Sequence, residues 1–307
     1  MKTENQATTE SSTLNFYGLE SNYSNYADSR IAILSVPYDG TSTYNKGADR
    51  GPQAILEAST QVELYDIETD FEVYQLGIVG LAPVTENSSP EEMVAAVKAR
   101  VSALLQDGKF PVILGGEHSV SAGAIQACKE SYPNISTLQF DAHGDTREEY
   151  YGSRYNHACV MARARECGPI VQVGIRAIDS SELEKMDRSR VVFAHQIKAT
   201  NSEKNWPEKN WIDRVSKGLT SEVYLTIDLD CFDSAIMPST GTPEPGGLNW
   251  YDLLDAVRQI ADRHNIIGLD IVELLPRESD PAPNFLAAKL LYQVLSIIFK
   301  PRQLAAA

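Results

Sequence analysis

The sequence predicts an α/β fold with a central, mostly parallel sheet covered by helices on both faces. Short apolar runs rich in β-branched residues recur along the chain, and segments with helical spacing or helix-start signals separate many of them. Strands this apolar are typical of parallel sheets, which are buried on both faces. With 307 residues and 43% hydrophobic content, the chain is long enough to bury a large core as one domain.

Residues 1–28 are polar and rich in Ser, Thr and Asn, so we expect a tail that packs on a neighbour or stays mobile. Residues 29–307 are expected to form a single domain, because no internal repeat or low-complexity linker divides them. The segments predicted as strands are Ile31–Val36, Pro111–Leu114, Ile135–Phe140, Ile170–Val173, Val191–Ala194, Val223–Ile227 and Ile266–Ile271.

Proline marks the start of two predicted helices, at the position where a missing N–H costs nothing. Gly51-Pro52 begins a helix that runs to about Thr60, and Ser89-Pro90 begins another. In the second helix, apolar residues follow helical spacing from Met93 to Leu104. Further helices are predicted near Val120–Lys129, Ser181–Met186, Trp206–Lys217, Trp250–Arg263 and Asn284–Phe299.

Three segments rich in carboxylates and imidazoles each follow an apolar run. They are Gly115-Gly-Glu-His-Ser119, Asp141-Ala-His-Gly-Asp145 and Asp228-Leu-Asp230. Because the carboxyl ends of parallel strands meet at one edge of a sheet, we expect these side chains to gather there. Taken singly, each segment has a structural interpretation: Asp serves in loops and caps, and Gly-Gly-Glu-His suits a tight turn. Their joint occurrence favours a functional site.

The donors in these segments indicate a metal centre. Carboxylates and imidazoles cannot share a small, partly dry volume as bare groups, because repulsion and desolvation oppose it. A donor set without thiolates suits harder divalent ions such as Mn²⁺ better than structural zinc, and six donors exceed what one tetrahedral ion needs. With bridging carboxylates, two ions could share the site. The candidate ligands are His118, Asp141, His143, Asp145, Asp228 and Asp230.

Between about Ile31 and Phe299 the chain resembles the ureohydrolase family of arginases and agmatinases, with agmatinases the most similar. The motifs that carry the resemblance are Leu114–Ser119, Phe140–Thr146 and Thr226–Asp233, followed by Pro238-Ser239 and Gly247. The resemblance implies a three-layer α/β/α arginase-type fold. It also implies two Mn²⁺ ions per subunit, and hydrolysis of a guanidino group to urea and an amine.

The resemblance implies a role for each metal ligand. His118 and Asp145 would bind one ion, His143 and Asp230 the other, and Asp141 and Asp228 would bridge both. A metal-bridging hydroxide would attack the guanidinium carbon, because two metals lower the pKa of a shared water. Asp145 would hold the proton of that hydroxide.

Three further residues receive roles by the same resemblance. His157 would contact the substrate and shuttle a proton, and Glu273 would bind the guanidinium through two parallel hydrogen bonds. Asp233, the third acid of its motif, would support the metal ligands. The chain departs from the common family pattern in two places: it has His157-Ala158 where a His-Gly pair is usual, and Ser234 where Pro is usual.

The loop Thr146–Asn156 carries the information on the substrate tail. Its Glu148 and Glu149 disfavour a carboxylate tail, so we expect agmatine, hydrolysed to putrescine and urea. N1-aminopropylagmatine, which would give spermidine, is the alternative. If Arg147 faced inward it would favour arginine or 4-guanidinobutanoate, and guanidine also stays open. Two other classes remain: a deacetylase-like hydrolase of the same fold and a metal-binding paralogue without catalysis.

Charge and cysteine content bound the partners and the compartment. A net charge of −15 opposes binding to nucleic acids or anionic membranes and would attract a small cationic substrate. The four cysteines form no C-x-x-C pair, which favours a reduced, cytoplasmic protein. The sequence shows neither a secretion signal nor a membrane span. The family resemblance implies a homo-oligomer, a trimer or a hexamer.

Overall fold

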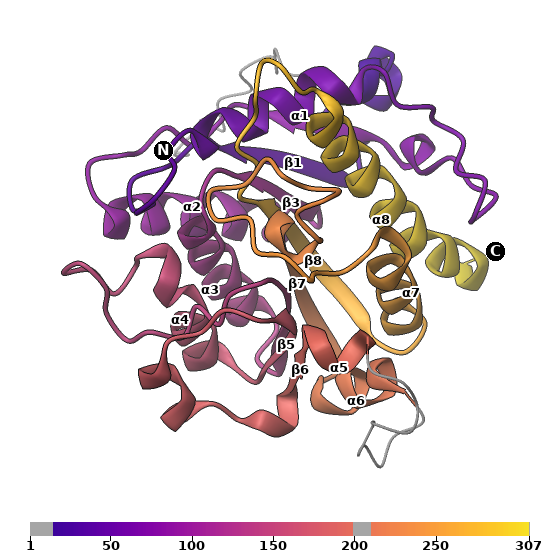
Figure 1. The fold of residues 1–307 in the computed structure, drawn as a ribbon. Coiled ribbons are helices and arrows are strands. Elements are labelled where there is room, and N and C mark those ends of the chain that lie inside the picture. Colours follow the sequence, from indigo (N-terminus) through magenta and orange to yellow (C-terminus); the bar gives the residue numbers. More distant parts are fainter. Residues whose placement is uncertain (1–14, 199–209, 307) are drawn as a thin grey trace, which may run out of the picture.

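The computed structural model describes residues 15–198 and 210–306, which contain one eight-stranded sheet. The sheet runs through the middle of the molecule (Figure 1). Every strand pairing is parallel, and the spatial order is β2-β1-β3-β8-β7-β4-β5-β6. The strands are β1 Ile31–Val36, β2 Ile78–Leu81, β3 Phe110–Gly115, β4 Ile135–Phe140, β5 Ile170–Ile175, β6 Val191–Phe193, β7 Glu222–Asp228 and β8 Asn265–Val272. The predicted parallel sheet is confirmed.

Helices cover both faces of the sheet and complete three layers (Figure 1). In β3, Val112 and Leu114 belong to one core and Ile113 to the other, because successive side chains of a strand point to opposite faces. The first core packs against α1, α7 and α8, and the second against α2, α3 and α4. The helices are α1 Gly51–Ser59, α2 Pro90–Gln106, α3 Ser121–Ser131, α4 Val160–Cys167, α5 Ala194–Lys198, α6 Trp211–Gly218, α7 Trp250–Ala261 and α8 Ala282–Ala306.

The structure differs from the predicted elements in a few places. Strand β2 was not predicted, because it has four residues, one of them glycine. Helices α4 and α5 were also missed; Ala194, predicted as the end of a strand, begins α5. The predicted helix Ser181–Met186 is a 3-10 helix, Ser180–Lys185, which a capping box of Asp179 and Glu182 starts. The predicted start of a helix at Trp206 lies outside the described residues.

Helix α8 accounts for the most apolar part of the chain. Its segment Ala282–Lys300 is long and apolar enough to cross a membrane by length and composition, but 72% of that stretch is buried inside the fold. It packs against α1 and α7 in the core. The hydropathy of this helix is therefore explained by its central position in one of the helical layers.

Residues 15–28, the described part of the segment expected to be a polar tail, contribute to the core. Phe16 and Tyr17 are buried there. The backbone N–H of Tyr17 donates to Ser59 Oγ at 2.9 Å, and its hydroxyl donates to the Ala288 carbonyl at 3.2 Å. Its ring meets that of Tyr292 edge to face, with centroids 5.0 Å apart. This short apolar cluster packs on α1 and α8 of its own chain, which the composition of residues 1–28 had obscured.

We expect Phe16→Ala to destabilise the domain by about 3–5 kcal/mol, since it removes a fully buried aromatic ring and leaves a cavity. The midpoint of urea unfolding measures this loss. Ile67→Ala is the matched control, because Ile67 is 82% exposed and its truncation should change stability by less than about 0.5 kcal/mol. Equal midpoints for the two variants would contradict the role of the N-terminal segment in the fold.

Candidate metal centre

The candidate ligands lie at the carboxyl ends of neighbouring central strands. Strands β3, β8, β7 and β4 are consecutive in the sheet, and the chain segments that follow them meet at one edge. His118 follows β3, Asp228 ends β7, and Asp141 follows β4 directly. The turn before His118 requires glycine: a Cβ on Gly116 would lie 2.0 Å from the carbonyl oxygen of Tyr38.

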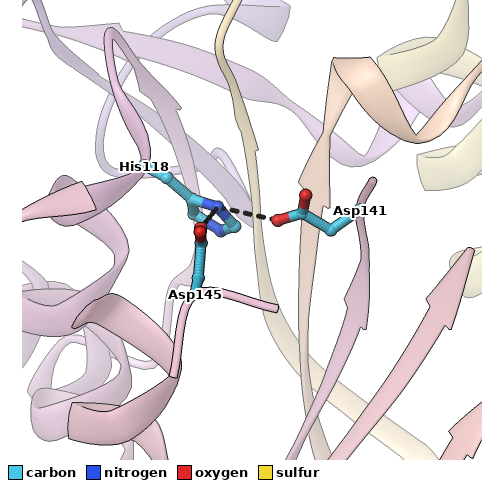
Figure 2. A group of neighbouring side chains, drawn as sticks. All are labelled: His118, Asp141 and Asp145. Atoms are coloured by element: carbon cyan, nitrogen blue, oxygen red, sulfur yellow. Dashed lines mark ion pairs between the residues drawn. The ribbon is translucent and has the colours of Figure 1, made fainter. Parts of the chain in front are cut away.

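One group of donors surrounds His118, which is buried (Figure 2). Its Nδ1 lies 3.1 Å from Asp141 Oδ2, 3.1 Å from Asp145 Oδ2 and 3.3 Å from Asp228 Oδ2. This Nδ1 has no hydrogen-bond partner within the described residues, although it is buried. An imidazole nitrogen that faces three carboxylate oxygens without a bond of its own fits a cation held between them.

The second group contains His143, which is partly exposed. Its Nδ1 lies 2.9 Å from Asp230 Oδ2 and 3.6 Å from Asp141 Oδ1. The two oxygens of Asp141 therefore face different imidazoles, as a bridging carboxylate would. All six residues that the sequence singled out as ligands are brought together here. Two groups that share Asp141 could each hold a metal ion, His118 with Asp145 and His143 with Asp230, and Asp228 approaches the first group through His118.

The charges in this cluster oppose one another. Burial and the negative charge of Asp141 raise the pKa of Asp145 to about 7. Burial, with repulsion from Asp230 and Asp141, raises the pKa of Asp228 well above its ordinary range. Although burial also favours neutral Asp141, the nearby imidazoles of His118 and His143 hold its pKa below the ordinary range. A divalent cation would remove this repulsion and favour the charged carboxylates.

A buried chain of hydrogen bonds fixes the orientation of His118. Its Nε2 lies 2.9 Å from Thr226 Oγ1, and that hydroxyl donates to Asp270 Oδ1 at 2.6 Å. Tyr224 donates to the other oxygen of Asp270 at 2.8 Å. Since a threonine hydroxyl has only one proton, Thr226 must accept from Nε2–H of His118. The lone pair of Nδ1 is then directed at the carboxylates.

Two residues of the site have backbone conformations that L-residues seldom adopt. Asp145 has φ 52° and Glu273 has φ 68°. Such conformations cost free energy and persist where the surrounding structure holds them, often at functional sites. In Glu273 the backbone N–H donates to the Gly116 carbonyl at 2.7 Å, and the side-chain Oε1 accepts from His118 N–H at 2.8 Å. These bonds leave Oε2 of Glu273 for another partner.

A cavity of about 360 Å³ opens beside the ligands. His157, Glu273 and Arg147 line it, so the structure brings these three predicted residues to the same space as the metal ligands. Burial and the neighbouring His118 and His143 imidazoles lower the pKa of His157 to about 4. A neutral imidazole at physiological pH can accept a proton.

Two predicted residues lie elsewhere. Glu148 is not among the residues that line the cavity: its carboxylate lies 3.1 Å from Arg163, 3.0 Å from Arg165 and 2.9 Å from Lys185. These cations draw Glu148 away from the cavity, so we no longer assign it to the substrate. The side chain of Asp233 accepts hydrogen bonds from the backbone N–H groups of Ala235, Gly246 and Gly247 and holds their loop, and it has no hydrogen bond to a candidate ligand within the described residues.

Arg176, which the sequence did not single out, connects two parts of the site. Its guanidinium donates to the carbonyl oxygens of Asp230 at 2.7 Å and Glu244 at 2.8 Å, and also to those of Phe232 and Pro245. The loop that carries Glu244 is thereby held against the segment that carries Asp230. A single Arg after an apolar strand offers no sequence signal for this role, because the carbonyls that it binds are distant in the chain.

Comparison with known proteins agrees with the geometry. A family model described as "Arginase family" matches residues 29–296. The N(1)-aminopropylagmatine ureohydrolase of Synechocystis sp. is 38% identical over 280 residues, which cover 88% of this chain and 89% of that protein. The agmatinase of Pyrococcus horikoshii is 32% identical, with 88% and 92% covered.

Solved structures agree as well. The agmatine ureohydrolase of Thermoplasma volcanium superposes with a TM-score of 0.81 at 31% identity, covering 92% of this chain and 94% of that one. The three-layer arginase-type fold expected from the sequence is confirmed by this likeness. The family match over most of the length, the relatives above 30% identity and the shared fold all lead to one conclusion: this chain belongs to the arginase family.

Proposed function

We propose that this protein is a binuclear-metal ureohydrolase that cleaves the guanidino group of an amine-tailed substrate to urea and a free amine. The observation that carries the proposal is one cavity lined by His157, Glu273 and the metal-ligand residues His143, Asp145, Asp228 and Asp230. A paralogue that only bound metal would have no need of His157 and Glu273 at that cavity.

The metal assignment expected from the sequence becomes part of the proposal. His118 and Asp145 would hold one Mn²⁺, His143 and Asp230 the other, and Asp141 and Asp228 both. The unpartnered Nδ1 of His118 and the two-sided position of Asp141 support it. When bound, the two ions would supply an activated water and polarise the substrate.

Glu273 would bind the guanidinium. Burial and the carboxylates of Glu117 and Asp230 raise the pKa of Glu273 well above its ordinary range. A guanidinium cation against Oε2 would favour the charged carboxylate and replace repulsion by a planar, charge-assisted pair. The guanidinium carbon would then lie beside the ligands, where water adds to it.

His157 would move the proton that the leaving group needs. Hydrolysis breaks the bond between the guanidinium carbon and the tail nitrogen, and that nitrogen leaves as an amine only after it gains a proton. A neutral His157 can take a proton released from the attacking water and pass it on.

The outer part of the cavity favours a cationic tail. Arg147 does line it, but its guanidinium lies 3.3 Å from Asp179 and 4.6 Å above the ring of Tyr150. Glu244 also lines the cavity and has no ion pair within the described residues. Arg147 is paired with Asp179, so Glu244 adds a negative charge to the lining, which opposes a carboxylate tail and attracts an amine.

We place N1-aminopropylagmatine, which would give spermidine and urea, ahead of agmatine. The similarity to the Synechocystis enzyme of that name supports the longer substrate. Agmatine, our first expectation from the sequence, is the second candidate, because similarity to agmatinases of Pyrococcus and other organisms supports it.

Adding Mn²⁺ to metal-free protein should raise the melting temperature by about 5 °C or more. The reason is that the cations bind only the folded state, in which the candidate ligands lie together. Asp141→Asn should lose most of this shift and all urea release. Asp262→Asn, which removes an exposed carboxylate, should keep both. No shift in the native protein, or an equal shift in Asp141→Asn, would contradict the binuclear assignment.

Thr226→Val should weaken metal binding about 10- to 100-fold, because it removes the hydroxyl that orients His118. Thr226→Ser keeps the hydroxyl and should bind metal nearly as the native protein does. Titration of the metal-free variants with Mn²⁺ gives the dissociation constants. Indistinguishable constants for the Val variant and the native protein would show that His118 needs no such support.

Urea release by the Mn²⁺-loaded protein tests the function on N1-aminopropylagmatine, agmatine, arginine, 4-guanidinobutanoate and guanidine. We expect kcat/KM for the amine-tailed pair to exceed that for the carboxylate-tailed pair by about 100-fold or more, since like charge against Glu244 costs several kcal/mol. Glu244→Gln should reduce this preference, and Glu184→Gln, an exposed matched change, should not.

Preference for arginine or 4-guanidinobutanoate would overturn the assignment of the tail. If the metal-loaded protein released no urea from any of the five compounds, the proposed hydrolase activity would be wrong. That result would favour a non-catalytic, metal-binding paralogue.

A further inference from the structure

A buried threonine joins His157 to a buried carboxylate. Thr41 lies in the loop after β1, and its Oγ1 is 2.8 Å from Glu117 Oε1 and 3.1 Å from His157 Nδ1. The backbone N–H of His157 also donates to this hydroxyl, at 2.9 Å. One hydroxyl therefore faces three groups, from segments that are far apart in the chain.

Counting protons fixes the direction of each bond. A threonine hydroxyl has one proton to donate and two lone pairs that accept. The N–H of His157 can only donate, so it takes one lone pair of Thr41. If the hydroxyl proton is directed at Glu117, the second lone pair is left to accept a hydrogen bond from Nδ1–H of His157.

The surroundings of Glu117 show that the hydroxyl proton does point at it. Glu117 is fully buried and accepts backbone N–H bonds on both oxygens, from Thr41 at 3.2 Å and from Ser119 at 2.8 Å. Ser119 Oγ donates to Oε1 at 2.9 Å. A carboxylate surrounded by donors acts as an acceptor throughout. Its own N–H bond to the Tyr38 carbonyl, at 2.9 Å, holds the segment in place.

We infer that Glu117 and Thr41 hold His157 in the tautomer with its proton on Nδ1, so that Nε2 is the basic nitrogen presented to the cavity. This inference rests on the proposed hydrolysis, in which His157 transfers a proton. Thr41 is a positioning residue: it is not among the residues that line the cavity, and it acts through the ring of His157. No hydrogen bond to Nε2 occurs within the part of the chain that the structure describes, so this nitrogen is free to serve.

The fixed tautomer matters because a neutral imidazole accepts a proton through one nitrogen only. With the proton on Nε2 instead, the ring would present a donor to the cavity, and Nδ1 would face a hydroxyl already committed to Glu117. The ring would then have to turn before each proton transfer. A preset tautomer removes that step. Its loss should therefore lower kcat and leave substrate binding, and with it KM, nearly unchanged.

The tautomer is measured directly on protein that carries ¹⁵N-histidine and diamagnetic Zn²⁺. Two-bond ¹H–¹⁵N spectra at pH 7.5 distinguish a protonated ring nitrogen from a bare one, and a His157→Asn sample assigns the signals. We expect a protonated Nδ1 and a bare Nε2 in the native protein, and loss of this pattern in Thr41→Val. A native His157 with its proton on Nε2, or an unchanged pattern in Thr41→Val, would overturn the inference.

Kinetics on the Mn²⁺ enzyme separate positioning from folding. Thr41→Val should lower kcat about 10- to 100-fold, with KM and metal content within about twofold of native. Thr41→Ser restores the hydroxyl and should recover most of kcat. Thr137→Val, the same change at a buried residue inside β4, should leave kcat and KM unchanged. Equal losses in the Ser and Val variants, or a loss confined to KM or metal content, would overturn the inference.

The two proposals fail in different ways. If the native enzyme releases no urea from any guanidino compound, the proposed function is wrong, and so is a kinetic role for Thr41, whatever tautomer is observed. If the native enzyme releases urea but the tautomer of His157 or the kinetics of Thr41→Val differ from the results expected above, only the inference about Thr41 is wrong.

Discussion

Four carboxylates within reach of two imidazoles, most of them buried, form the constraint on which the rest of this structure depends. Burial and the charge of Asp141 raise the pKa of Asp145, and burial with the charges of Asp230 and Asp141 raises that of Asp228, so the cluster is unfavourable without a cation. The chain holds the cluster together with backbone donors: Asp141 accepts from His143 N–H at 2.6 Å, Asp228 from Asp230 N–H at 2.9 Å and Asp230 from Ala142 N–H at 3.0 Å. Those backbones follow β4 and β7, which are adjacent parallel strands, and a flexible loop could not hold such charges at these distances.

Each of the two key imidazoles is oriented through a threonine. Asp270 acts on His118 through Thr226, and Glu117 acts on His157 through Thr41. In both hydrogen-bond series the carboxylate accepts a hydrogen bond from the threonine hydroxyl. The hydroxyl has no second proton, so it can only accept a hydrogen bond from the imidazole. Asp270 and Glu117 thus act on the imidazole through a hydroxyl rather than by direct contact, and the hydroxyl fixes the tautomer of the ring. A neutral ring is what a metal ligand and a proton acceptor both require.

The gathering of the candidate ligands could be predicted from the sequence because each is encoded locally, soon after an apolar strand. Parallel strands end at the same edge of the sheet, and this topology brings His118 and Asp228 together although 110 residues separate them. Thr41 and Arg176 could not be predicted, since their partners are set only by tertiary packing. Strand β2 has only four residues, too few to show the hydrophobic pattern by which a strand is recognised in a sequence.

The charged residues that line the cavity could not be predicted from their neighbours in the sequence. Glu148 is next to Arg147 in sequence, yet Arg163 and Lys185 draw it away, whereas Asp179 from a later segment pairs with Arg147.

Glu244 lines the cavity instead, on a loop whose carbonyls are bound by Arg176. The same guanidinium binds the carbonyl of Asp230, a proposed metal ligand. A residue that would select the substrate tail is thus fixed to the segment that would hold the metal. Any shift of this loop that altered tail recognition would therefore also act on the segment of Asp230, and would couple substrate selection to the proposed metal centre.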